Sequence, residues 1–127
     1  MTILPKDITT FKDVCEIVDN QYSQLLAHPV AGRHFQGLNL EEHLPRIYNF
    51  WSFILEVDPI NHAYKGSAFE PHVRLNLTPE DFEVWQQCLK NAVLGKFEGE
   101  TAVKMLNKAE QLGVMFQYKL GILKTDE

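Results

Sequence analysis

Apolar residues recur at the three- and four-residue spacing of an amphipathic α-helix in four stretches of this chain. This periodicity limits the possible folds more than any other feature of the sequence. No stretch shows a sustained alternation of apolar and polar residues with the period of two that is typical of strands, and no hairpin-turn dipeptide occurs. The sequence therefore predicts an all-α fold of four substantial helices.

Capping and proline signals predict the bounds of the first two helices. Thr10 begins a capping-box pattern, and the first helix is expected to end near residues 28–29, before a proline. The second helix is expected to begin around residues 41–44, with Pro45 in its first turn or so. It is expected to end at Asp58-Pro59. The predicted buried stripe of the first helix consists of Phe11, Val14, Cys15, Val18, Tyr22, Leu25 and Leu26.

The third and fourth helices have clearer start and stop signals. Thr78 is a predicted N-cap, followed by Pro79 at the first helical position and by acidic residues in the first turn. Gly95 is the predicted stop. The last helix is expected to begin after Gly99 and to close at Gly121.

Two aromatic residues near the first helix carry further expectations. Tyr22 lies on the apolar stripe, so its hydroxyl is expected to find a hydrogen-bond partner inside the protein. Phe35 is expected to anchor an irregular connector over residues 29–39 in the core.

Size and charge bound the class of protein. The 127 residues are predicted to form a single domain, 1–127, with 45% hydrophobic and 23% charged residues. A net charge of −5 argues against a nucleic-acid partner, and no apolar run is long enough to span a membrane. The N-terminus lacks a signal-peptide pattern, and Cys15 and Cys88 are far apart in sequence, which suggests a cytoplasmic protein.

Several common catalytic and binding motifs are absent. The sequence contains no GxxxxGK, GxGxxG, HExxH or GxSxG. None of the five histidines lies three or four residues from another, which argues against a helical di-histidine metal site.

One histidine stands in an unusual setting, the segment over residues 69–75. Pro71 precedes His72, and Ser67 and Glu70 have the capping-box spacing of a short helical turn. An imidazole on such a braced element can bind a metal through one ring nitrogen. A half-buried structural histidine is the commoner case, and the segment alone leaves both interpretations open.

Taken together, the residues resemble the truncated haemoglobins of bacteria, specifically the third group of that family. The resemblance covers about residues 11–120. It rests on the order and spacing of Tyr22, Phe35, Glu42-His43, Ile47, Asn49-Phe50-Trp51, Pro71-His72 and Phe82-Glu83-Val84-Trp85.

The resemblance implies a two-over-two helical sandwich, with helices B and E packed against G and H, and with a short F segment. It implies haem b as the cofactor and His72 as the iron ligand. It places Tyr22, Trp85 and His43 on the opposite, distal side, as the residues that act on a bound ligand. Residues expected to contact the haem, including Arg46 or Arg74 as propionate partners, are Phe35, Arg46, Ile47, Phe50, Phe69, Arg74, Phe82, Trp85 and Phe116.

Two residues depart from the pattern of the group. Gln21 precedes Tyr22, where the group has an aromatic or apolar residue, and adds a polar group near the expected pocket. Pro45 follows shortly after His43 and can tilt the start of helix E, so that His43 points either to solvent or into the pocket.

The implied function is binding of O₂, NO and CO at a five-coordinate iron. A donor-rich distal side favours redox chemistry on the bound ligand, such as NO dioxygenation or peroxidase-like turnover, over bulk transport. Such chemistry needs a reductase, which the sequence does not identify, and a monomer is expected. The alternative is a haem-free α-helical binding module, in which the aromatic residues fill a core and His72 is structural.

Overall fold

A computed structural model describes residues 5–35, 37, 39–61 and 77–121. The described elements are α1 (Phe11–Ala27), the 3₁₀-helix η1 (Ala31–Phe35), α2 (Leu40–Ile54), α4 (Pro79–Leu94) and α5 (Glu100–Lys119). Within these ranges the β structure is limited to one isolated bridge between Lys6 and Phe97. The predicted all-α fold with four long helices is confirmed.

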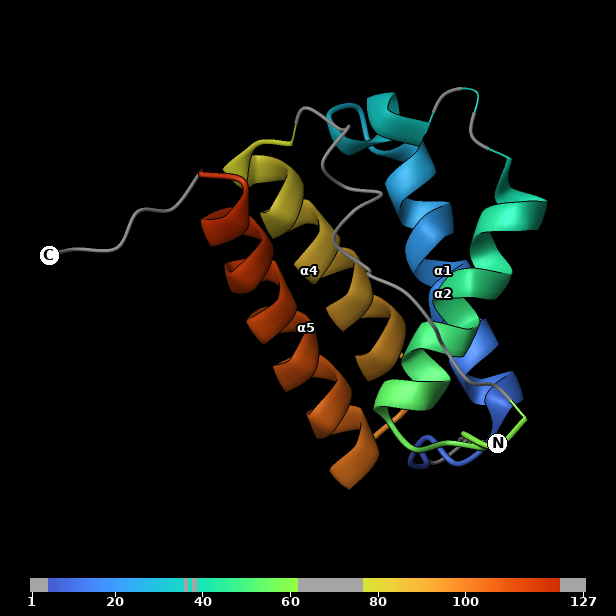
Figure 1. The fold of residues 1–127 in the computed structure, drawn as a ribbon. Helices are drawn as coiled ribbons and strands as arrows, with labels where there is room; N and C mark the ends of the chain where they lie inside the picture. Colours follow the sequence, from blue (N-terminus) through green and yellow to red (C-terminus); the bar gives the residue numbers. More distant parts are fainter. Residues whose placement is uncertain (1–4, 36, 38, 62–76, 122–127) are drawn as a thin grey trace, which may run out of the picture.

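The helices form two antiparallel pairs, α1 with α2 and α4 with α5, which lie side by side (Figure 1). The pairs meet mainly where α1 packs against α4. The core lies around this contact, because each helix turns its apolar stripe toward it. Large apolar side chains that are fully buried in this core include Val14, Ile17, Val18, Leu25, Trp51, Leu89, Val93 and Met105.

The predicted capping box at Thr10 and the predicted N-cap at Thr78 are present, and the turn predicted from Ser67 and Glu70 lies outside the described residues. The Thr10 hydroxyl accepts a hydrogen bond from the Asp13 amide, and the Asp13 carboxylate accepts one from the Thr10 amide. Thr78 and Asp81 make the same reciprocal pair at the start of α4. Each box satisfies amide groups that have no partner inside their helix, which is why these starts were predictable from a few adjacent residues.

α2 begins earlier than predicted. Its N-cap is Asn39, whose side-chain oxygen accepts a hydrogen bond from the Glu42 amide at 3.4 Å. The helix therefore starts at Leu40, and Pro45 lies at the start of its second turn.

α2 also ends earlier than the predicted Asp58-Pro59. It stops at Ile54 because Glu56 adopts a left-handed conformation, with φ of 57°. The Val57 amide donates to the Ser52 carbonyl at 2.9 Å, and the Glu56 amide donates to the Phe53 carbonyl at 3.2 Å. These two bonds make a Schellman motif, which usually has glycine at the position of Glu56.

The N-terminus of α5 is capped by a residue far away in the sequence. Asp7 accepts hydrogen bonds from the amides of Thr101 at 3.0 Å and Ala102 at 2.9 Å. Gly99 permits this approach, since a Cβ on it would lie 2.5 Å from the Asp7 Cγ, and its φ is 141°. The predicted start after Gly99 and the predicted close at Gly121 are both confirmed.

Two expectations at and after the end of α1 were wrong. Leu26 is not on the buried stripe, because its side chain is 43% exposed. The connector predicted to be irregular contains η1, and the amides of Val30, just before it, and of Ala31, its first residue, donate to Nδ1 of His28.

Candidate functional site

Three residues that the sequence singled out lie together. The Tyr22 ring from α1 packs edge-on against Phe35 of η1, with ring centroids 5.4 Å apart. It also meets the ring of His43, from the first turns of α2, at 6.0 Å. His43 therefore lies beside Tyr22 in this structure, despite the nearby Pro45. This group is called the Tyr22 cluster below.

The Tyr22 hydroxyl is the unusual atom of this cluster. The residue is only 7% exposed, and no described residue makes a hydrogen bond with the hydroxyl, so the predicted internal partner is not among the residues that the structure describes. Burial raises the pKa of the phenol. Tyr22 thus remains a protonated donor at neutral pH, with its hydrogen bond unused in this part of the structure.

α2 contributes apolar side chains and one cation. Ile47 and Phe50 are half-buried and pack against the core, and the Phe50 ring lies 5.4 Å from the fully buried ring of Trp51. Arg46 is exposed. α2 packs mainly on α1, so its half-buried residues are not covered by extensive contact with α4 or α5.

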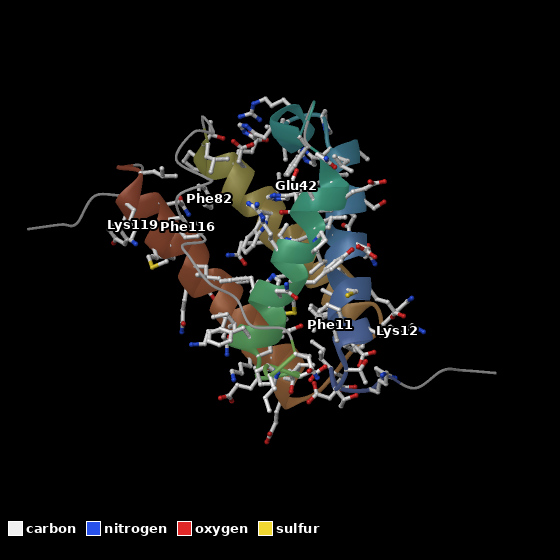
Figure 2. The ribbon with its side chains drawn as sticks, turned by 45° about the vertical axis from the view of Figure 1, so that its right-hand side comes forward. Phe11, Lys12, Glu42, Phe82, Phe116 and Lys119 are labelled. Atoms are coloured by element: carbon white, nitrogen blue, oxygen red, sulfur yellow. The ribbon has the colours of Figure 1, made fainter. Side chains whose placement is uncertain are left out.

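α4 and α5 contribute three more aromatic residues. Trp85 is half-buried and packs against the core. Phe82 and Phe116 are buried, and Figure 2 shows them at the same end of the α4–α5 pair. The two helices approach closely there, since a Cβ on Gly113 would meet the side chains of Gln86 and Phe82.

Gln21 joins α1 to α4 and was not predicted to do so. It is fully buried, and its Nε2 donates to the backbone carbonyl of Trp85 at 3.1 Å. Its Oε1 is buried and has no hydrogen-bond partner among the residues that the structure describes. The sequence signal was the polar residue itself, at a position where an apolar one was expected.

A second unpredicted contact holds η1 against the start of α4. The Asp81 carboxylate accepts two hydrogen bonds from the Arg33 guanidinium and one from Nε2 of His34, each at 2.9 Å. Burial alone would raise the pKa of Asp81. The hydrogen bonds from Arg33, His34 and Thr78 outweigh that effect and lower the pKa to about 2. The contact fixes η1, and with it Phe35 of the Tyr22 cluster.

Three predicted site residues cannot be located in this way. His72, the predicted iron ligand, lies outside the described residues, as do Phe69 and Arg74. The geometry above therefore concerns the predicted distal side and the apolar contacts of α1, α2, α4 and α5.

Comparison with known proteins gives one informative result. No protein-family model matches the chain, and no curated protein matches it. A solved structure, a group III truncated hemoglobin from Campylobacter jejuni, superposes with a TM-score of 0.80 and 21% sequence identity. The match covers 92% of this chain and 95% of the other. This chain has the truncated-globin fold. The two-over-two arrangement and the resemblance predicted from the sequence are confirmed at the level of the fold.

The described residues of this truncated-globin fold suit a haem group. The buried Tyr22 ring, whose hydroxyl bonds to no described residue, lies beside a histidine, and half-buried apolar side chains stand on α2 and α4. Arg46 is exposed, as a partner of a solvent-facing carboxylate would be. No helix in the described ranges is both long and apolar enough to cross a membrane.

Proposed function

We propose that this protein binds haem b and, at the iron, diatomic ligands such as O₂, NO and CO. The observation that carries the proposal is the truncated-globin fold with the Tyr22 cluster inside it. The Tyr22 ring is buried beside His43, and no described residue makes a hydrogen bond with its hydroxyl. The hydroxyl is therefore available to donate to a bound ligand.

His72 would be the protein's iron ligand. Haem held by one histidine supplies an open iron position for a diatomic gas. The haem contacts would come from Phe35, Ile47, Phe50, Phe69, Phe82, Trp85 and Phe116, and Arg46 or Arg74 would pair with a propionate.

The distal residues have distinct roles in this proposal. The Tyr22 phenol and the Trp85 indole each donate a hydrogen bond toward the gas ligand, and His43 closes the cluster against water. Two donors in a dry pocket slow ligand release. The proposed activity is therefore redox chemistry on the ligand, either NO dioxygenation or peroxidase-like turnover, with a separate reductase, rather than bulk O₂ transport. The protein acts as a monomer in this proposal.

Haem titration tests the cofactor. The purified full-length chain should gain a Soret band at one equivalent of haem, and His72→Ala should lose or shift that band. His62→Ala is the matched control, because the resemblance gives that histidine no role. Protein that stays folded and colourless after haem addition would contradict the proposal and favour the haem-free binding module.

The reaction class needs a separate experiment. Stopped-flow mixing of the O₂-loaded protein with NO is compared with peroxide turnover of the ferric protein, at equal haem occupancy. Fast NO consumption with slow peroxide turnover supports dioxygenation, and the reverse supports a peroxidase-like role. If both rates equal those of free haem, redox chemistry is excluded and ligand storage or sensing remains.

A further inference from the structure

Two glutamines of α1 reach the backbone of α4 in the same way. Gln21 and Gln24 are three residues apart, and each donates through Nε2 to a carbonyl of α4. The acceptors are Trp85 at 3.1 Å and Cys88 at 3.2 Å, which are also three residues apart. The chain therefore offers two similar bonds across one helix contact, one turn apart.

The two bonds differ in their surroundings. Gln24 is half-buried, and its Oε1 accepts a hydrogen bond from Nδ2 of Asn91 at 3.1 Å. Gln21 is fully buried, and its Oε1 has no partner within residues 5–35, 37, 39–61 and 77–121. An apolar side chain would fill that position without desolvating an amide. Ordinary helix packing therefore accounts for the half-buried Gln24, whose amide is bonded through both its nitrogen and its oxygen. It does not account for a fully buried amide at Gln21.

The position of the Gln21 bond suggests a purpose. Gln21 directly precedes Tyr22, and its acceptor is the carbonyl of Trp85 itself. That carbonyl lies in the middle of α4 and has a second lone pair besides the one used in the helix ladder. The bond thus links the segment of α1 that carries Tyr22 to the backbone of Trp85 in α4, and these are the two proposed distal donors.

We propose that Gln21 is a positioning residue, which holds Trp85 at a set place relative to Tyr22 through the Trp85 carbonyl. This inference rests on the proposed function. Gln21 does not touch the ligand; it sets the separation of two groups that do. A buried amide here keeps one arrangement of α1 and α4, where an apolar side chain would allow several of similar energy.

The substitution Gln21→Met separates this role from a purely structural one. Methionine has similar length and removes both the Nε2 donor and the unpartnered Oε1. Removing both leaves stability nearly unchanged, because a lost hydrogen bond is offset by a lost buried orphan group. Gln24→Met is the matched control, since it removes the same kind of bond one turn away.

The first measurement does not require a gas ligand. NMR signals of the indole N–H groups are recorded for the ¹⁵N-labelled full chain, without haem and again after haem addition. The variant Trp51→Phe identifies which signal belongs to Trp85. Gln21→Met should move or broaden the Trp85 signal, while Gln24→Met leaves it in place. Equal changes in both variants, or no change in either, would overturn the proposal.

The second measurement uses the haem-loaded protein. Gln21→Met should raise the O₂ dissociation rate about tenfold, similar to the smaller effects of removing a partner that orients a metal ligand. Gln24→Met should leave the rate within about twofold. If haem binds and Gln21→Met leaves the rate unchanged, Gln21 has no positioning role, although the proposed function stands. If haem does not bind, the proposed function fails and so does this inference.

A wild-type measurement keeps the contact testable if Gln21→Met does not fold. The side-chain amide protons of buried Gln21 should exchange with solvent far more slowly than those of exposed Gln87. Equal exchange rates would show that the Gln21 bond is absent and would overturn the proposal.

Discussion

At the scale of single residues, the Tyr22 hydroxyl makes no hydrogen bond with any described residue. Its ring packs in the core against Phe35, and a phenylalanine would fill the same space without the hydroxyl. Tyr22→Phe should therefore leave the haem-free protein as stable as the wild type, or more stable by up to about 1 kcal/mol. The same change should raise the O₂ dissociation rate by about tenfold or more, since it removes a ligand hydrogen bond.

Urea unfolding of the haem-free chain and stopped-flow O₂ release measure the two effects. Tyr48→Phe is the control, because the Tyr48 hydroxyl donates to Asp19 and is part of the fold. That variant should lose about 1 kcal/mol of stability and keep its O₂ release rate. A Tyr22→Phe protein that is destabilised and releases O₂ at the wild-type rate would show that the hydroxyl is structural.

Asp81 should make stability depend on acid pH. Its pKa is about 2 in the folded protein, against an ordinary value of 3.8. A carboxyl with a lower pKa when folded stabilises the protein above the unfolded pKa. That contribution disappears as the pH falls from about 5 to about 2, and it amounts to about 2 kcal/mol.

Asp81→Asn should remove this acid-dependent part. The free energy of unfolding of the variant, measured with urea, should be about 2 kcal/mol below wild type at pH 6 and close to it at pH 2. Glu80→Gln, an exposed acid in the same helical turn, should leave the wild-type pH profile intact. If the Asp81 and Glu80 variants give the same profile, the hydrogen bonds from Arg33 and His34 do not stabilise the fold.

At the scale of whole elements, the end of α2 offers a stabilising substitution. Glu56 sits in the left-handed conformation of a Schellman motif, where glycine has no Cβ to strain the backbone. Glu56→Gly should raise the free energy of unfolding by about 0.5–1 kcal/mol. The ion pair that it removes, with Lys104 at 3.7 Å, is exposed and contributes little.

A glycine on an exposed helix face should do the opposite. Ser23→Gly within α1 is expected to cost about 0.5 kcal/mol, because glycine has the lower helix propensity. The melting temperatures of Glu56→Gly, Ser23→Gly and the wild type, measured by thermal unfolding, test both expectations. A lower melting temperature for Glu56→Gly would mean that the Glu56 side chain makes a contribution that outweighs its backbone strain.

The cap of α5 should be worth about as much as a local one. Asp7→Ala leaves the amides of Thr101 and Ala102 without their acceptor, which should cost about 0.5–2 kcal/mol. Hydrogen exchange at those two amides should speed up with the loss. Glu98→Ala, an exposed acid next to the same turn, should change neither quantity. Unchanged exchange in Asp7→Ala would mean that other groups cap the helix.

These elements show which features a sequence reveals on its own. Thr10 and Thr78 each act within three residues of their partners, so both caps were predictable. Asp7 caps a helix more than 90 residues away, and Asp81 binds Arg33 across 48 positions. No local pattern contains such pairs. The early end of α2 was missed for a different reason, because Glu56 stands where the usual signal is glycine.

At the scale of the whole molecule, the fold was more predictable than the site. The order of helices follows from apolar periodicity, which survives exchange of one core residue for another of similar volume. This explains how a chain can share 21% identity with a truncated hemoglobin and still superpose with a TM-score of 0.80. The site depends on single side chains brought together from α1, η1 and α2. The resemblance identified Tyr22, Phe35 and His43, whereas Gln21 needed the three-dimensional structure.

A haem that binds only the folded chain must also stabilise the whole molecule. The gain is RT ln(1 + [L]/Kd), about 4 kcal/mol at a thousandfold excess of haem over Kd. For a domain of this size, that corresponds to a rise in melting temperature of about 10–20 °C. Iron-free protoporphyrin IX is the matched ligand, because it keeps the flat apolar surface and the propionates but cannot bind an imidazole. It should give a clearly smaller rise, and His72→Ala should bring the haem rise down to the same level. Equal rises for the two ligands in the wild type would mean that apolar burial alone holds the group, and that no histidine–iron bond forms.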